Sequence, residues 1–181
     1  MRLFHTVCAA LLLTAAVTAQ KAEAPLRNAV DVPAKQVALR LGSRDAAGIP
    51  GQPIELIAEL SLKPKMHVYA PGQADYIPIS LTLGESADFK AEPAVYPVAR
   101  SLYLEPIQQS VKVYESTFRI TQRVTIELTP DLKRRAAAGD TLAIPATLKY
   151  QACDDVVCYR PETVKLTWQL KLATAARLTP R

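Results

Sequence analysis

"ETVKLTWQLKL", residues 162–172, alternates apolar and polar side chains along its whole length. Successive side chains of a β-strand point to opposite faces, so this period of two is typical of a strand with one face in a core. The apolar face consists of Val164, Leu166, Trp168, Leu170 and Leu172. The stretch therefore predicts a half-buried β-strand and indicates the fold class of the whole chain.

Similar alternation occurs earlier in the chain, in "QVALRLGS" (36–43) and "IELIAELSL" (54–62). Further strands are predicted at residues 66–69, 79–83, 116–128 and 140–152. The one predicted helix, "DLKRRAAAG" over residues 131–139, is short and ends at a glycine. Several short strands separated by proline and glycine predict an all-β fold, an immunoglobulin-like antiparallel β-sandwich.

The first residues have the features of an export signal. Arg2 gives a positive start, an apolar run covers residues 7–19, and Val17-Thr18-Ala19 offers small side chains for cleavage before Gln20. The run is shorter than the roughly 20 apolar residues of a membrane-spanning helix. We therefore expect a signal peptide over residues 1–19, no membrane span in the mature chain, and a periplasmic or secreted location.

The rest of the chain divides into three predicted parts. Residues 20–34 mix alanine, proline and charges without periodicity, which indicates a flexible leader. The folded domain is expected over residues 35–172, followed by a tail at 173–181. Cys8 lies inside the signal and is expected to be removed with it, so that Cys153 and Cys158 remain as a pair.

The charge pattern gives little support for a polyanionic partner. The formal net charge is +5, and it falls to +4 when Arg2 leaves with the signal. The densest basic run, Lys133-Arg134-Arg135, has no aromatic residues interleaved for stacking on bases. We interpret it as a solvated turn and predict no nucleic-acid partner.

The predicted strands 140–152 and 162–172 flank the cysteine pair. Cys153 then ends one strand and Cys158 lies in the connection, at a rim of the sandwich rather than between its sheets. Closing so short a loop stabilises a domain by only about 2 kcal/mol in the chain-entropy model. Exported proteins form disulfides routinely, so a structural staple and a redox couple both remain open on the residues alone.

Charges between the cysteines bear on the redox alternative. The carboxylates of Asp154 and Asp155 disfavour a nearby thiolate, although Arg160 and the loop amides could offset them. A strongly oxidising couple depends on a stabilised thiolate in its reduced form. We therefore expect a comparatively reducing couple that passes electrons on.

Four tyrosines are candidates to shield the sulfurs: Tyr69, Tyr114, Tyr150 and Tyr159. The alternative interpretation, packing residues at strand edges, is equally open for each of them.

Other chemistries find little support. His67 is the only histidine outside the signal, and no Gly-x-Ser-x-Gly motif is present, so a hydrolase is not predicted. His67 is interpreted as a strand-end residue. One histidine and two cysteines do not make a tetrahedral zinc site or a blue-copper site, and Cu(I) held by the two sulfurs has no further support. No metal and no cofactor are expected.

A family resemblance is carried by "YQACDDVVCYRPET" (150–163). It resembles the Tyr-Gln-x-Cys…Cys-x-x-Pro signature of the N-terminal periplasmic domain of the thiol:disulfide interchange protein DsbD. "LKPKMHVYAPG" (62–72), "YPVARSL" (96–102) and "VKVYES" (111–116) resemble further segments of that family. The similarity covers residues 36–172.

The resemblance implies an immunoglobulin-like domain that takes electrons from a thioredoxin-like partner or a membrane electron carrier. It would pass them to periplasmic clients similar to disulfide isomerases. Cys158 would form the mixed disulfide with partners, and Cys153 would resolve it. A cap loop would shield the pair, and the candidate here is residues 112–116 with Val113 and Tyr114.

A full DsbD continues into a membrane-embedded carrier and a thioredoxin-like domain, whereas this sequence stops at Arg181. We accordingly expect a separate protein to supply the electrons. The main alternative is a non-catalytic β-sandwich binding module in which the cysteines only pin a loop.

Overall fold

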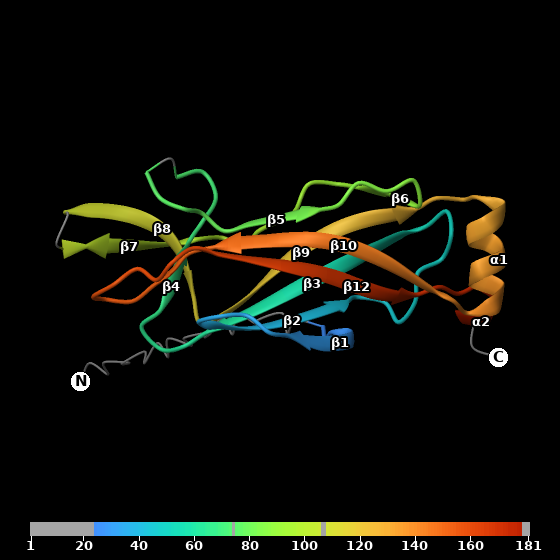
Figure 1. Cartoon of the computed structure of the whole chain (residues 1–181), viewed down its shortest axis with the longest axis horizontal. Helices are drawn as coiled ribbons and strands as arrows, with labels where there is room; N and C mark the ends of the chain where they lie inside the picture. Colours follow the sequence, from blue (N-terminus) through green and yellow to red (C-terminus); the bar gives the residue numbers. More distant parts are fainter. Residues whose placement is uncertain (1–23, 74, 106–107, 179–181) are drawn as a thin grey trace, which may run out of the picture.

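The computed structural model describes residues 24–73, 75–105 and 108–178, and the predicted signal peptide, with Cys8, lies outside them. The chain forms an elongated antiparallel β-sandwich with a short helical segment at one end (Figure 1). One sheet has the order β1 (Arg27–Val32), β2 (Val37–Ser43), β3 (Pro53–Leu62), β9 (Thr117–Ile126), β6 (Phe89–Ala91). A second has the order β12 (Glu162–Lys171), β10 (Thr141–Tyr150), β5 (Ser80–Leu83). The all-β, immunoglobulin-like prediction is confirmed.

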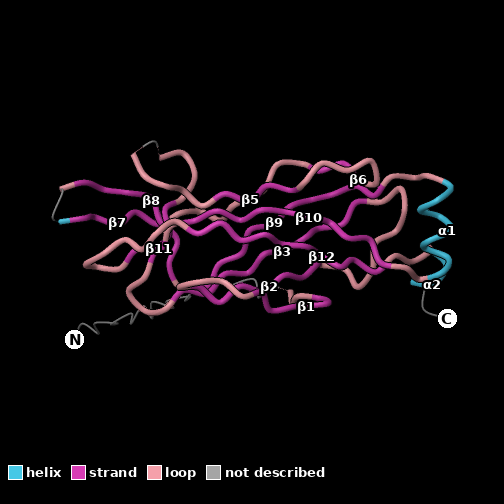
Figure 2. Tube along the Cα trace, in the orientation of Figure 1, coloured by secondary structure: helices cyan, strands magenta, loops and turns pink. Residues whose placement is uncertain are grey.

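A third, four-stranded sheet lies at the end of the sandwich away from the helices (Figure 2). Its order is β11 (Ala152–Cys153), β4 (His67–Tyr69), β8 (Gln109–Glu115), β7 (Arg100–Leu104). The chain passes from β10 of one sheet almost directly into β11 of the other, with Gln151 between them. The predicted strand 140–152 is therefore two strands in two sheets, and this change of sheet places the first cysteine at the rim.

The stretch 162–172 behaves as its pattern predicts. β12 pairs with β10 over ten residues, from Thr141 opposite Lys171 to Tyr150 opposite Glu162. Burial alternates along both strands, and the apolar face of β12 packs into the main core. The buried Trp168 indole N–H donates to the Gly42 carbonyl of β2 at 2.9 Å, which ties the two layers together.

Helix α1 (Pro130–Ala138) confirms the predicted helix. Thr129 caps its start by accepting a hydrogen bond from the Leu132 amide, and Pro130 occupies the first turn, where no amide donor is needed. Gly139 ends it in the left-handed conformation at φ 78°, which glycine adopts without steric cost. A four-residue helix α2 (Ala175–Leu178) follows β12, within the predicted tail.

The predicted flexible leader differs from the structure. Arg27–Val32 form β1 at the edge of the larger sheet, with Val30 opposite Leu41 and Val32 opposite Leu39 of β2. None of the six residues is fully buried, so the hydrophobic pattern that marks the other strands is missing here. Strands β6, β7 and β8 are also absent from the strands predicted from the sequence.

Candidate functional site

Cys153 and Cys158 form a disulfide, with their Cα atoms 3.9 Å apart. Strand β11, which carries Cys153, lies at the end of the molecule opposite α1 (Figure 2). Cys153 is the last residue of β11, and the loop after it folds back so that Cys158 forms a β-bridge with Cys153. Two backbone hydrogen bonds close this loop, from the Asp154 amide to the Val157 carbonyl and from the Tyr159 amide to the Ala152 carbonyl, each 2.9 Å. The predicted position of the pair, at a rim and not between the sheets, agrees with the structure.

The two sulfur-bearing residues differ in their access to solvent. Cys153 is 1% exposed and belongs to a small apolar cluster with Tyr69, Val111 and Val113. Cys158 is exposed. Of the two residues, only Cys158 is open to solvent.

Strand β4 forms the wall behind the disulfide. The Tyr69 hydroxyl lies 3.9 Å from the sulfur of Cys158 and 4.0 Å from that of Cys153. Its ring stacks on Tyr76 at a centroid distance of 4.3 Å, and the Tyr76 hydroxyl donates to Gln109 of β8 at 3.1 Å. Tyr69 is thus held against both sulfurs, and burial raises the pKa of its hydroxyl, which keeps it protonated.

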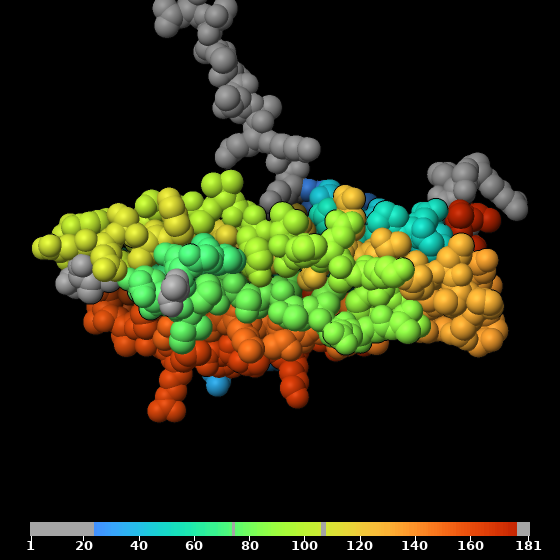
Figure 3. Space-filling view, turned by 90° about the horizontal axis from the view of Figure 1, so that it is seen from above, coloured from blue at the N-terminus to red at the C-terminus, as the bar shows by residue number. Residues whose placement is uncertain are grey.

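The disulfide borders a hollow of about 330 Å³. The residues lining it come from β4, β7, β11 and the cysteine loop: His67, Tyr69, residues 102–105, and residues 153–158. The residues expected in a cap loop, Lys112, Val113, Tyr114 and Glu115, lie within strand β8, where Val113 pairs with Tyr69. The segment beside the sulfurs is the end of β7, which meets the cysteine loop at one end of the surface (Figure 3).

The predicted shielding residues separate into two groups. Tyr69 and Val113 share the apolar cluster of Cys153. Tyr114 and Tyr150 lie in the main core, where their hydroxyls donate to the carbonyls of Pro97 and Lys35. Burial raises the pKa of Tyr150 to about 12, in accord with a packing role.

Tyr159 interacts with the charged Asp154 of the cysteine loop. Its hydroxyl donates to one oxygen of Asp154 at 3.1 Å, and the other oxygen accepts the amides of Val156 and Val157 at 2.9 and 2.8 Å. These amide bonds are the largest cause of the lowered pKa of Asp154, so this carboxylate stays charged. The hydrogen bond to Asp154 in turn raises the pKa of Tyr159. Two of the loop amides that could have stabilised a thiolate are thereby bound to a carboxylate.

His67 has an environment that its sequence position did not reveal. It begins β4, as a strand-end residue, but it is 3% exposed and stands directly opposite Cys153 of β11. Its Nε2 atom is buried and has no hydrogen-bond partner among the described residues. Burial is the largest influence on its pKa and lowers it. To predict this environment of His67, one would have to know that β4 pairs with β11, a strand far away in the sequence.

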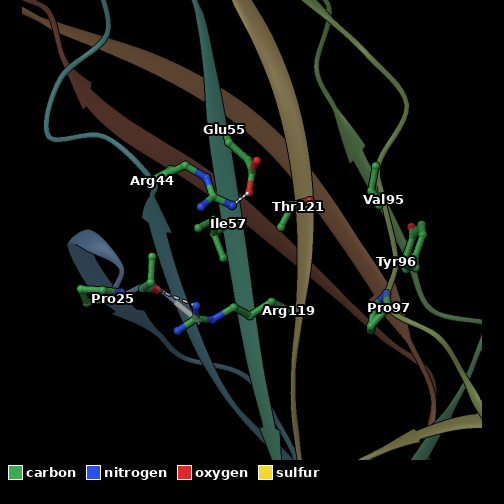
Figure 4. Close-up of a pocket in the computed structure, with 10 residues that line it drawn as sticks. Pro25, Arg44, Glu55, Ile57, Val95, Tyr96, Pro97, Arg119 and Thr121 are labelled. Carbon is green, nitrogen blue, oxygen red and sulfur yellow. Dashed lines mark hydrogen bonds and ion pairs between the residues drawn. The ribbon is translucent and has the colours of Figure 1, made fainter. Parts of the chain in front are cut away.

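A separate pocket of about 400 Å³ lies away from the cysteines, against β3 and β9 (Figure 4). Arg44 donates to Glu55 at 2.7 Å, and Arg119 donates to the carbonyl of Ala24 at 2.8 Å. Its polar groups are thus largely paired with one another. Among the described residues no group of three or more histidine, cysteine or acidic side chains is placed to hold a metal ion.

A comparison of the chain with known protein families finds a match over the region that contains the cysteine pair. The family model for the N-terminal domain of the thiol:disulfide interchange protein DsbD matches residues 39–169, well over half of the chain. The chain belongs to the DsbD N-terminal domain family. The matched residues include all of the strands from β3 to β11 and both cysteines. Members of this family act in thiol:disulfide interchange, as the family's description states.

Two solved structures are similar in shape. The N-terminal periplasmic domain of ScsB from Proteus mirabilis matches with a TM-score of 0.52 at 12% identity, over 83% of this chain and 53% of that one. At this identity the match shows the fold alone, and the chain spans about half of the ScsB chain. The reduced DsbD N-terminal domain from Neisseria meningitidis gives a TM-score of 0.42 at 13% identity, over 74% of this chain and 85% of that one. No curated protein matches the chain.

In the described part of the chain, no helix has the length and hydrophobicity needed to cross a lipid bilayer.

Proposed function

We propose that this DsbD N-terminal-type domain exchanges disulfides with partner proteins through Cys158 and Cys153. The observation that carries the proposal is their unequal exposure, an accessible Cys158 joined to a Cys153 that is 1% exposed. A relay needs one sulfur that partners can reach and a second, protected sulfur that releases them. The family membership supports the exchange function.

The reaction divides into two exchanges. In the reduced domain the Cys158 thiolate attacks the disulfide of an oxidised partner, forms a mixed disulfide and displaces one partner thiolate. The Cys153 thiolate then attacks the sulfur of Cys158, forms the internal disulfide and displaces the second partner thiolate. Both partner thiolates take up protons, so the partner gains two electrons and the domain loses two. No metal or organic cofactor takes part in these steps.

The surface around Cys158 supports contact with a protein rather than a small molecule. Val156 and Val157 of the cysteine loop are 93% and 50% exposed, and Tyr103 of β7 is 51% exposed beside them. Exposed apolar and aromatic side chains around a reactive centre are typical of protein-binding surfaces. The proposed reductant is a thioredoxin-like protein or membrane electron carrier. The proposed clients are periplasmic disulfide isomerase-like proteins, met after export and removal of the signal peptide.

Electrostatics favours a reducing couple. The charge of Asp154 lies in the cysteine loop, and the Val156 and Val157 amides donate to it rather than to a sulfur. A thiolate formed here has weak stabilisation, which makes the reduced form a better electron donor. Equilibration with glutathione buffers should therefore give a reduction potential below that of disulfide-forming catalysts.

A trapping experiment separates this proposal from the structural-staple alternative. The oxidised domain is mixed with a thioredoxin-like protein that lacks its resolving cysteine, and a covalent complex through Cys158 is expected. The same mixture with Cys158→Ala is the control and should give no complex. A disulfide that resists the thioredoxin-like protein, with no trapped species, would support a binding module whose disulfide is only structural.

A further inference from the structure

Cys153 is buried in the oxidised domain, yet it must lose a proton when it resolves the mixed disulfide. A thiol is a poor nucleophile compared with its thiolate, and burial in apolar surroundings raises a thiol pKa. Cys153 is 1% exposed and packed with Tyr69, Val111 and Val113. A base inside the protein is therefore needed if the buried sulfur is to react near neutral pH.

His67 is placed to be that base. It is the residue directly opposite Cys153 in the antiparallel pair of β4 and β11. Directly opposed residues of an antiparallel pair project on the same face of the sheet. Both residues also line the hollow at the disulfide, and the His67 ring meets the Tyr69 ring edge to face at 5.4 Å. Its buried Nε2 has no partner among the described residues and can accept a proton.

We propose that His67 is the residue that takes the proton from Cys153 when this sulfur resolves the mixed disulfide. The inference rests on the exchange function proposed above and adds one residue to its second step. The Cys153 thiol gives its proton to the imidazole, which produces a thiolate and an imidazolium. The thiolate attacks the sulfur of Cys158, the new bond closes the internal disulfide, and the bond to the partner sulfur breaks. The partner leaves as a thiolate and is protonated by the imidazolium or by water.

The other titratable groups nearby are less suited to this role. The Tyr69 hydroxyl stays protonated because burial raises its pKa. Asp154 already accepts two amides and the Tyr159 hydroxyl. Asp155 lies on the exposed loop, 4.0 Å from Lys65.

Surrounding charges assist the imidazolium once it forms. Glu115 of β8 stands opposite His67 on the side away from Cys153 and raises its pKa, as do Asp155 and Asp154 more weakly. Arg100 of β7 pairs with Glu115 at 2.9 Å, and Lys65 pairs with Asp155, so each carboxylate is partly neutralised. Burial outweighs these carboxylates in the resting domain, which keeps His67 neutral and able to accept a proton.

Two-phase release of 5-thio-2-nitrobenzoate measures the resolving step by itself. The reduced full chain, carrying Cys8→Ala so that only two sulfurs react, is mixed with 5,5′-dithiobis(2-nitrobenzoate). Cys158 releases the first chromophore in a bimolecular phase. Cys153 releases the second in a first-order phase that does not depend on reagent concentration.

The dependence of the second-phase rate on pH tests the proposal. With His67 present, the proton moves within the pair, so the second rate should be nearly constant between about pH 6.5 and 8. In His67→Gln it should rise about tenfold per pH unit, because only the free thiolate reacts. It should also be at least about tenfold slower than the parent at pH 7. The first phase should be the same in both proteins. Equal second-phase profiles in the parent and in His67→Gln would overturn the role of His67, whereas absence of the first phase in the parent would overturn the exchange function itself.

A second variant keeps the test independent of the folding of His67→Gln. Glu115→Gln leaves His67 in place but removes a charge that stabilises the imidazolium. In this variant the pH-independent second-phase rate should be lower than in the parent. The fall of this rate in acid, where His67 is protonated, should begin at a lower pH. An unchanged profile in Glu115→Gln would contradict the proposal.

Discussion

The two ends of this sandwich differ in the length of their strand pairings. In the body, β10 and β12 are joined through ten registered pairs and bury every second residue in the main core. At the cysteine end, β4 is joined to β11 through two pairs and to β8 through three. The body holds its shape through long ladders and apolar packing. The cysteine end is a short sheet attached to it, with an exposed loop and a buried histidine whose Nε2 has no partner among the described residues.

The difference indicates how a covalent bond can change at one end without loss of the fold. The main core is formed mainly by residues of β2, β3, β9, β10 and β12, and Val68, Tyr114 and Ala152 of the cysteine-end sheet also reach it. Cys153 itself lies in a second, small cluster with Tyr69, Val111 and Val113. Opening the disulfide removes a link within the cysteine loop and leaves the long ladders intact. We therefore expect the domain to remain folded when the disulfide opens.

The largest expected effect concerns the exposed sulfur. Cys158→Ala should abolish disulfide exchange with a thioredoxin-like partner, because no other accessible sulfur remains in the described domain. Cys153→Ala should still react but stop at the mixed disulfide, which non-reducing electrophoresis would detect. If Cys153→Ala formed no adduct while Cys158→Ala did, the roles of the two cysteines would be reversed.

A substitution in the main core tests whether the body of the sandwich and the cysteine end are independent. Leu148 is fully buried in β10, opposite Val164, and Leu148→Ala should lower the free energy of unfolding by about 3 kcal/mol. Urea titration measures this loss. The rate at which Cys158 reacts in the folded variant should not change, and a parallel loss of reactivity would show that the two ends are coupled.

Reduction of the disulfide should cost less. The chain-entropy model gives about 2 kcal/mol for so short a loop, so the reduced domain should remain folded, with a lower urea midpoint and unchanged far-ultraviolet circular dichroism. The double variant Cys153→Ala/Cys158→Ala serves as a control that cannot reoxidise. Melting of the domain on reduction at room temperature would contradict the separation of the two ends.

The smallest expected effect is a pH dependence at the cysteine end. His67 has a lowered pKa in the folded state, so below about pH 6.5 the unfolded chain binds a proton that the folded chain does not. Stability should therefore fall as the pH drops below 6.5, by at most about 1.4 kcal/mol per pH unit from this group. His67→Gln should remove this part of the slope. Urea midpoints between pH 7 and pH 5 for both proteins would measure it, and identical slopes would mean that His67 gains its proton equally in both states.

Local pattern predicted much of the fold. β12, β3 and β2 follow from the alternation of apolar residues, and α1 from its short helical run and Gly139. β1 escaped prediction because it is an edge strand with no fully buried residue. The resemblance suggested a cap loop at residues 112–116 where the structure has the end of β8, because a resemblance indicates which segments are related and not how their strands pair.

The sequence by itself determined the sandwich class, the cysteine pair and its place at a strand end, since each depends on residues that are close together in the chain. Only the tertiary structure decided which sulfur is exposed and what surrounds the buried one. Burial and the neighbours of Cys153 depend on the pairing of β11 with β4 and of β4 with β8, strands far apart in sequence. No local pattern records such a register, so His67 acquired its place beside Cys153 only when the sheet was formed.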